Sequence, residues 1–204
     1  KPRCVRCAVD LDSGRDDGAF HCAQCIKQPP LFNYCVTATS FNPLTGKLIN
    51  QLKHQGKLSA TVPIATNMIE AIKTHYAHNA SNIDLVIPVP LHINRLRKRG
   101  FNQANEIAKP ICKALGLTLN FNLCERQLNN PPQQQSALAA RHKNLRGAFI
   151  IKPEVKAEIK GKHIAIIDDV VTTGATANAV AKTLLDAGAT CCDIWCFSRT
   201  PRKH

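Results

Sequence analysis

Two aspartates and the small polar loop that follows them carry the clearest chemistry in this chain. Asp168 and Asp169 come directly after an apolar run, and Val170 and Val171 separate them from the loop Thr172, Thr173, Gly174, Ala175 and Thr176. Unpaired amides at a helix start bind anions, and threonine hydroxyls add donors. Carboxylates accept hydrogen bonds from sugar hydroxyls instead. The pattern therefore predicts a site for a ribose 5-phosphate, with the acids at the sugar and the loop at the phosphate.

A strand and a helix must hold these groups in place. The apolar run 164–167 predicts a buried strand, and apolar residues recur at helical spacing from Ala177 to Leu184. Gly188 stands where a left-handed cap would end that helix. The alternative is an ordinary strand–loop–helix corner with solvated aspartates. Neither GxGxxG nor GxxxxGK[ST] occurs, so the glycine-rich nucleotide motifs are not matched.

A second candidate site follows an earlier strand. The apolar segment 82–87 ends in Pro88, Val89, Pro90 and Leu91, and four cations follow at Arg95, Arg97, Lys98 and Arg99. Ligands of open α/β sheets bind beyond the carboxyl ends of strands, so these cations are placed to meet a polyanion. A solvated basic face is the alternative. The next helix is predicted from Gln103 to Leu115.

Upstream of this strand, the sequence predicts a strand within 32–41, a turn at 42–46, a short helix over 47–53 and a longer helix over 58–78. Lys53, His54 and Lys57 are interpreted as a solvated basic patch, with contact to a ligand as the alternative.

The stretch DDVVTTGAT resembles the signature of the type I phosphoribosyltransferases, and PVPLH, RGFNQ and KNLRGAF resemble the ComF family of competence-associated proteins. The resemblance implies that Asp168 and Asp169 bind the ribose hydroxyls of phosphoribosyl pyrophosphate (PRPP) and that residues 172–176 bind its 5-phosphate. Residues 88–91 would meet the pyrophosphate together with Arg95, Arg97 and Arg99, and Mg2+ would accompany the ligand. The resemblance also implies a flap whose Arg141 and Lys143 act in catalysis. A structural surface helix is the alternative for that segment.

Four cysteines near the start have the spacing of a metal site. Cys4, Cys7, Cys22 and Cys25 form two CxxC pairs, and the segment between them is too polar to bury a core. We predict a structural Zn2+ site, with two disulfides or a redox pair as alternatives. His21 is the other candidate ligand, although four thiolates suffice.

Charge and composition limit the partners and the location. Lys and Arg total 27 against 14 Asp and Glu, which gives a net charge of +13 and predicts a polyanionic partner. Aromatic content of 5% argues against extensive base stacking, so single-stranded DNA would bind mostly through phosphates. We expect no membrane insertion, because no apolar run is long enough. The other cysteines are scattered through apolar segments, which favours a reducing cytoplasm.

Together these patterns predict an α/β fold, with a mostly parallel central sheet flanked by helices. The expected division is a zinc-binding knuckle at 1–30 and a phosphoribosyltransferase-like domain at 31–204. The resemblance implies displacement of pyrophosphate from PRPP by an acceptor that the sequence does not identify, and a part in DNA uptake during natural transformation beside a helicase-like competence protein. The alternatives are a non-catalytic accessory that binds single-stranded DNA and a protein adaptor.

Overall fold

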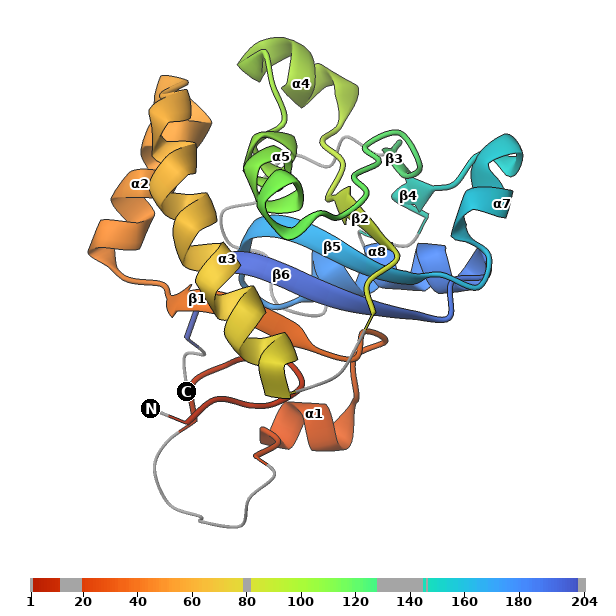
Figure 1. Ribbon diagram of the computed structural model, residues 1–204, viewed down its shortest axis with the longest axis horizontal. Coiled ribbons are helices and arrows are strands. Elements are labelled where there is room, and N and C mark those ends of the chain that lie inside the picture. The colour runs from red at the N-terminus through yellow and green to blue at the C-terminus, as the bar shows by residue number, and fades with distance from the viewer. Residues whose placement is uncertain (1, 12–19, 79–81, 128–144, 146, 202–204) are drawn as a thin grey trace.

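A parallel sheet forms the centre of the protein (Figure 1). The computed structural model describes residues 2–11, 20–78, 82–127, 145 and 147–201. Four strands pair in the order β1-β6-β5-β2, and all three pairings are parallel. Their bounds are β1 Cys35–Ser40, β2 Leu85–Pro88, β5 His163–Val171 and β6 Cys191–Arg199. The predicted α/β class and parallel sheet are confirmed.

The strand β5 is longer at its carboxyl end than the apolar pattern predicted. The buried run was expected to stop before Asp168, but β5 continues to Val171. It does so because β6 continues to pair with it, from Asp168 opposite Cys196 to Val171 opposite Arg199. The two aspartates therefore belong to the end of a strand, and their backbone is held by sheet hydrogen bonds.

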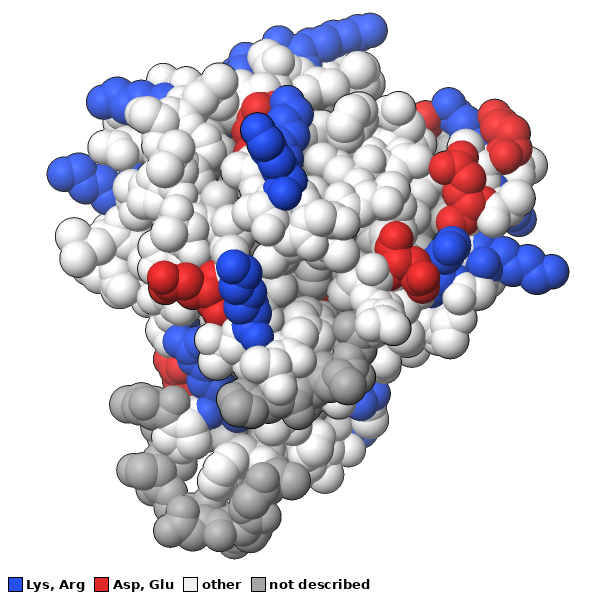
Figure 2. Space-filling view, viewed as in Figure 1, with Lys and Arg blue, Asp and Glu red and all other residues white. Residues whose placement is uncertain are grey.

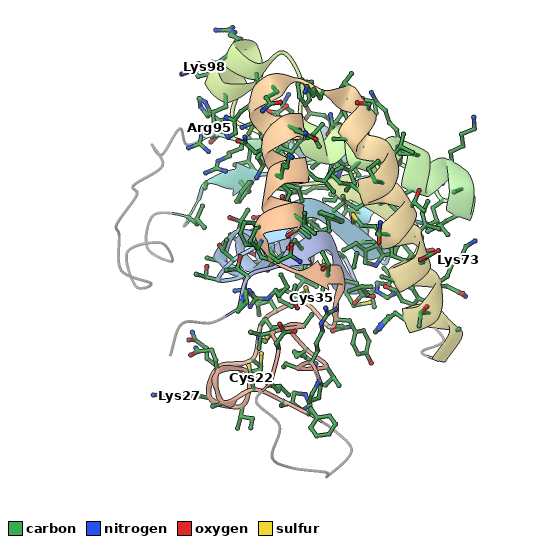
Figure 3. All side chains as sticks on the ribbon, turned by 90° about the vertical axis from the view of Figure 1, so that its left-hand side faces the viewer. Cys22, Lys27, Cys35, Lys73, Arg95 and Lys98 are labelled. Atoms are coloured by element: carbon green, nitrogen blue, oxygen red, sulfur yellow. The ribbon has the colours of Figure 1, made fainter. Side chains whose placement is uncertain are left out.

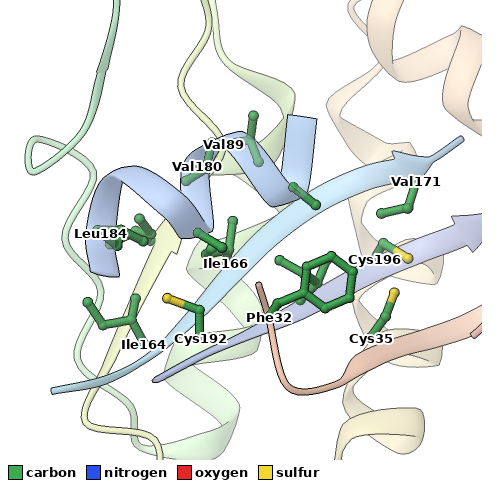
Figure 4. Packing of buried hydrophobic residues seen from close by; sticks show 14 of the residues in the cluster. Phe32, Cys35, Val89, Ile164, Ile166, Val171, Val180, Leu184, Cys192 and Cys196 are labelled. Carbon is green, nitrogen blue, oxygen red and sulfur yellow. The ribbon is translucent and has the colours of Figure 1, made fainter. Parts of the chain in front are cut away.

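Helices cover both faces of the sheet. The helices α2 (Pro43–Gln55), α3 (Thr61–His78) and α5 (Gln103–Leu115) contribute to the core on one face, and α8 (Ala175–Asp186) covers the other. Side chains of β5 alternate between the faces, so that Ile164 and Ile166 pack with α8 and Ala165 and Ile167 with the opposite core. Figure 4 shows the α8 side of this arrangement.

The helix α2 begins earlier than the sequence predicted. A turn was expected at 42–46 and a short helix only from 47, but the helix starts at Pro43. Asn42 explains the difference, because its side chain accepts hydrogen bonds from Leu44 N and Thr45 N while Thr45 Oγ1 accepts one from Asn42 N. Pro43 then occupies the first helical position, where it is favoured.

Shorter elements complete the described structure. The basic run after β2 forms α4 (Ile93–Arg99), and in Figure 2 the edge of the molecule where Figure 1 draws α4 carries Lys and Arg side chains. A small antiparallel pair joins β3 (Glu125–Arg126) to β4 (Phe149–Ile150). The remaining elements are α1 (Ala23–Lys27), η1 (Leu58–Ala60), η2 (Pro153–Val155) and α7 (Lys156–Ile159). Among the described residues, no helix combines the length and apolarity needed to cross a lipid bilayer.

The N-terminal cysteine segment packs against the sheet. Its four cysteines belong to the same buried cluster as Phe32, Cys35 and Cys196. Figure 3 shows Cys22 and Lys27 at one end of the molecule, Arg95 and Lys98 on α4 at the other, and the sheet between them. The division at residue 30 stays a prediction.

Candidate functional site

The end of β5 brings the two aspartates into different surroundings. Asp169 is buried, and its Oδ2 lies 2.5 Å from Lys53 Nζ on α2. Gln103 Nε2, at the start of α5, donates to Asp169 Oδ1 at 3.4 Å. Asp168 is half-buried, and its Oδ1 accepts a hydrogen bond from Asp169 N at 2.9 Å. The protein therefore neutralises one carboxylate itself and leaves the other more open to solvent.

The surroundings of the acid pair change the pKa of Asp168. Burial raises the pKa of Asp168 well above its usual range, and the Asp169 carboxylate raises it further. The Lys53 ammonium acts in the opposite direction. A cation, or hydroxyl groups that donate hydrogen bonds, would favour the ionised pair in the same way. The two acids are thus suited to a ligand that supplies both a cation and hydroxyl groups.

The loop after β5 has the geometry of an anion site. Gly174 has a φ of 83°, a left-handed conformation that only glycine adopts at low cost, and it directly precedes α8. Thr173 Oγ1 accepts a hydrogen bond from Ala175 N at 3.2 Å. Ala175 and Thr176 lie in the first turn of the helix, so the predicted loop spans a helix N-terminus, where amides and dipole favour a phosphate.

The turn after β2 borders the same edge of the sheet. Val89 N donates to Ile167 O at 2.8 Å, just before the acid pair. Asn102 fixes this turn, because its Nδ2 donates to Val89 O at 3.0 Å while its Oδ1 caps α5 through Ala104 N at 3.1 Å. The predicted segment Pro88, Val89, Pro90 and Leu91 thus lies beside the aspartates.

Some of the predicted cations face the acid pair. Arg99 donates to Gln103 Oε1, and burial lowers its pKa while the Asp169 carboxylate raises it. Arg126 lies 5.5 Å from the centre of the Phe149 ring, and its pKa is lowered by burial and by Arg95, and raised by Asp168. Arg99 therefore interacts with Asp169 and Arg126 with Asp168, and Arg95 interacts with both of these arginines.

The predicted site and the observed site do not contain the same residues. Arg97 is exposed on α4, as is Lys98. Arg141 and Lys143 lie outside the described residues, so their predicted catalytic role stays untested. The site also contains Lys53, Gln103 and Arg126, to which the sequence analysis assigned no definite role. Lys53 was interpreted mainly as part of a solvated patch, and only its position in the last turn of an amphipathic helix could have indicated otherwise.

The four cysteines form a second candidate site. Cys4, Cys7, Cys22 and Cys25 are all buried, and their sulfur atoms lie within 4.8 Å of one another. We call this set the four-cysteine cluster. The sulfur atoms of Cys7 and Cys22 lie 3.7 Å apart. Two thiolates bound to one tetrahedral zinc ion, with bonds of about 2.3 Å, have their sulfur atoms roughly 3.8 Å apart. The cluster therefore has the donors and spacing to hold a metal ion.

The backbone of the first CxxC pair supports this interpretation. Ala8 has a φ of 54°, and Ala8 N donates to Cys4 O, which turns the first CxxC pair back on itself. A hydrogen bond with Cys7 is the main cause that lowers the pKa of Cys4 to about 4, and Cys22 N donates to Cys4 Sγ at 3.3 Å. The hydrogen bond between Cys4 and Cys7 also raises the pKa of Cys7, and burial raises the pKa of Cys25 to about 12. His21 is exposed and is not among the clustered ligands.

Two arginines attach the cysteine segment to the sheet. Arg3 binds β1, since Nη1 donates to Thr37 O at 3.1 Å and Nη2 to Ser40 Oγ at 3.2 Å. Asp10 pairs with Arg3 Nε at 3.2 Å and accepts from Ser40 Oγ at 2.8 Å. Arg199, at the end of β6, donates from Nε to Cys7 O at 2.8 Å.

Known proteins resemble this chain over most of its length. Residues 54–203 match the model of the phosphoribosyl transferase domain family. DNA utilization protein YhgH of Shigella flexneri is 30% identical over 203 residues, which cover 98% of this chain and 85% of that protein. Competence protein F of Haemophilus influenzae is 28% identical over 97% of this chain and 85% of its own length. Adenine phosphoribosyltransferase of Saccharomyces cerevisiae superposes with a TM-score of 0.43 at 18% identity, over 66% of this chain and 68% of that one.

Proposed function

This chain belongs to the phosphoribosyl transferase domain family, and from that premise we propose that it binds PRPP with Mg2+ at the end of β5. Asp168 and Asp169 would accept hydrogen bonds from the ribose hydroxyls, and residues 172–176 would hold the 5-phosphate. The observation that carries the proposal is the acid pair at a strand end, next to a helix N-terminus, with Arg99 interacting with Asp169 and Arg126 with Asp168.

The proposed chemistry is displacement of pyrophosphate at C1 of the bound ribose. The chain's own groups support it by position and charge, since arginines near the leaving pyrophosphate stabilise the negative charge that develops there. Pro88, Val89, Pro90 and Leu91 would line the pyrophosphate subsite with Arg95, Arg97 and Arg99. Arg141 and Lys143 stay proposed as catalytic residues, and the acceptor is unassigned. Mg2+ would neutralise the pyrophosphate oxygens.

Calorimetric titration of PRPP with Mg2+ tests the binding site. The parent protein is expected to bind, and the double variant Asp168→Asn/Asp169→Asn is expected to lose binding. Asp186→Asn is the matched control, because it also removes one carboxylate but lies exposed on α8, paired with Lys182. Loss of binding in Asp186→Asn, or retained binding in the double variant, would contradict the proposal.

We also propose that the four-cysteine cluster binds one structural Zn2+ per chain. The donor set of four thiolates suits zinc, and a closed tetrahedral site without an open position is structural rather than catalytic. We also propose a cytoplasmic location, because none of the ten cysteines forms a disulfide and the six outside the cluster are buried or half-buried.

A part in DNA uptake is supported by the names of two relatives, DNA utilization protein YhgH and Competence protein F. We propose that the exposed cations Arg97 and Lys98 on α4 contact the phosphates of single-stranded DNA beside a helicase-like partner. The variant Arg97→Gln/Lys98→Gln is expected to weaken DNA binding and flatten its salt dependence by a slope of about 1 to 2. Because Arg97 is also proposed to meet the pyrophosphate, the single variant Lys98→Gln, which is expected to weaken DNA binding and to leave PRPP affinity unchanged, tests whether the two activities separate. Salt-independent DNA binding by the parent would contradict this proposal.

A further inference from the structure

Arg199 is a buried cation that connects the four-cysteine cluster to the ribose-phosphate loop. It is the last residue of β6 and is 2% exposed. Its Nε donates to Cys7 O at 2.8 Å, and its Nη1 donates to Val171 O at 3.0 Å and also to Thr172 O. The same guanidinium therefore holds a residue of the cluster and the first residue of the loop.

The partners of Arg199 leave its charge without a counter-ion. Its side chain donates hydrogen bonds to backbone carbonyls, among them Thr200 O at 3.1 Å. In the part of the chain that the structure describes, no carboxylate forms an ion pair with it. Burying a guanidinium in neutral surroundings is costly, so the fold at this position favours an anion nearby.

A metal-loaded cluster would supply that anion. Four thiolates around one divalent ion carry a net charge of about −2, and Arg199 already binds the carbonyl of one ligand residue, Cys7. The Arg199 guanidinium is also among the causes that lower the pKa of the neighbouring Cys196 thiol, after a hydrogen bond with Cys35, whose own pKa is raised.

The other end of Arg199 sets the orientation of two peptide groups. In a trans peptide the N–H points away from the carbonyl oxygen. Because Arg199 holds Val171 O and Thr172 O, the amides of Thr172 and Thr173 point away from the guanidinium. These amides open the segment that leads into α8, where a phosphate is expected. A shift of Arg199 would therefore turn the donors of the loop.

We propose that Arg199 is a positioning residue that couples the metal state of the four-cysteine cluster to the ribose-phosphate loop. With metal bound, the anionic cluster holds the guanidinium in place, and the guanidinium holds the loop ready for the phosphate. With metal removed, that restraint is lost and the loop binds phosphate less tightly. This inference rests on the proposed PRPP site and on the proposed metal site.

Thermodynamic linkage gives a test on the full-length parent protein that needs no substitution. If metal strengthens binding of the sugar phosphate, then the sugar phosphate must strengthen binding of metal by the same factor. The probe is ribose 5-phosphate, which keeps the hydroxyls and the 5-phosphate but carries no pyrophosphate to chelate zinc. Zinc affinity is measured by competition with a zinc-selective chelator, with and without saturating ribose 5-phosphate. We expect an increase of at least about 5-fold, the lower end of typical coupling.

Two variants then test the path. Arg199→Met is expected to reduce the coupling factor to about 1, and Arg199→Lys, which keeps the charge but lacks the guanidinium fork that binds the four carbonyls, is expected to restore part of it. Arg3→Met is the matched control. Arg3 also attaches the cysteine segment to the sheet, but it does so at Thr37 and Ser40 of β1. It is expected to weaken zinc binding in both conditions and to leave the coupling factor unchanged.

The outcomes separate this inference from the proposals beneath it. If neither PRPP nor ribose 5-phosphate binds the parent protein, the PRPP proposal is wrong. If zinc does not bind, the metal proposal is wrong. In either case the coupling is wrong as well. If both bind and zinc affinity changes less than 2-fold, the coupling alone is wrong. Undiminished coupling in a folded Arg199→Met protein would overturn the role of Arg199, as would equal loss of coupling in Arg3→Met.

Discussion

Lys53 Nζ on α2 lies 2.5 Å from Oδ2 of the buried Asp169 at the end of β5. Residue 53 immediately precedes the part of the chain that matches the phosphoribosyl transferase domain, which begins at 54. A helix almost wholly outside the matched segment therefore supplies the counter-ion for one of the two proposed ribose-binding acids. The ammonium lowers the pKa of Asp168, against the larger effect of burial and of the neighbouring Asp169 carboxylate, which raise it.

Removing Lys53 should destabilise the protein. Lys53→Met leaves the Asp169 carboxylate buried without its cation, and we expect a loss of about 2 kcal/mol in the free energy of unfolding, measured by urea titration. Lys182→Met is the matched control, because its pair with Asp186 is more than 60% exposed on both sides and should cost below about 0.5 kcal/mol. Equal losses in the two variants would show that burial does not strengthen the Lys53 pair.

Asn102 should affect ligand binding as well as stability. Asn102→Ala removes the cap of α5 and the hydrogen bond to Val89 O in the proposed pyrophosphate turn. We expect a loss of about 1 kcal/mol in stability and a PRPP affinity about 3- to 10-fold weaker in calorimetry. Asn42→Ala removes the comparable cap of α2, far from the turn in sequence, and should reduce stability only. An unchanged PRPP affinity in Asn102→Ala would refute this assignment.

The metal content should depend on the clustered cysteines alone. The parent protein, purified without a histidine tag, is expected to hold one zinc per chain by elemental analysis. Cys25→Ser should lose most of it and melt at a lower temperature, because a hydroxyl replaces one of four thiolates. Cys191→Ser, outside the cluster, should retain the zinc. Intact disulfides in place of zinc, seen by mass spectrometry, would rule out the metal site.

His75 should make the protein sensitive to acid. Its ring packs edge-on against Tyr34 and Tyr76, at 5.0 and 4.9 Å between ring centres. Burial lowers its pKa, and the nearby Asp193 carboxylate opposes this. The unfolded chain therefore takes up the proton more readily, and stability should fall as the pH drops below about 6.5.

Urea unfolding at several pH values between 8 and 5 measures the effect. His75→Gln should lose less stability than the parent over this range, since it no longer carries the buried imidazole. His54→Gln, an exposed histidine on α2, should follow the parent curve. If the His75→Gln and parent curves fall in parallel, His75 is not the source of the acid sensitivity.

The sequence predicted those parts of the site that are continuous along the chain. The strand, acid pair, loop and helix from His163 onward form one local unit, and its order follows from apolar periodicity and glycine position. The cysteine spacing likewise predicted a cluster, because four ligands in two CxxC pairs need only short loops to converge. Local geometry of this kind is encoded within a few residues.

Only the tertiary structure showed which distant side chains complete the site. In the sheet of order β1-β6-β5-β2, the helices α2 and α5 pack beside the end of β5. This packing brings Lys53 and Gln103 into contact with Asp169. The same packing brings the end of β6 against both Cys7 and Thr172, and so gives Arg199 its partners. The sequence determined the chemistry of each segment. The packing of the sheet decided which charges meet, because that depends on register and helix placement across the whole chain.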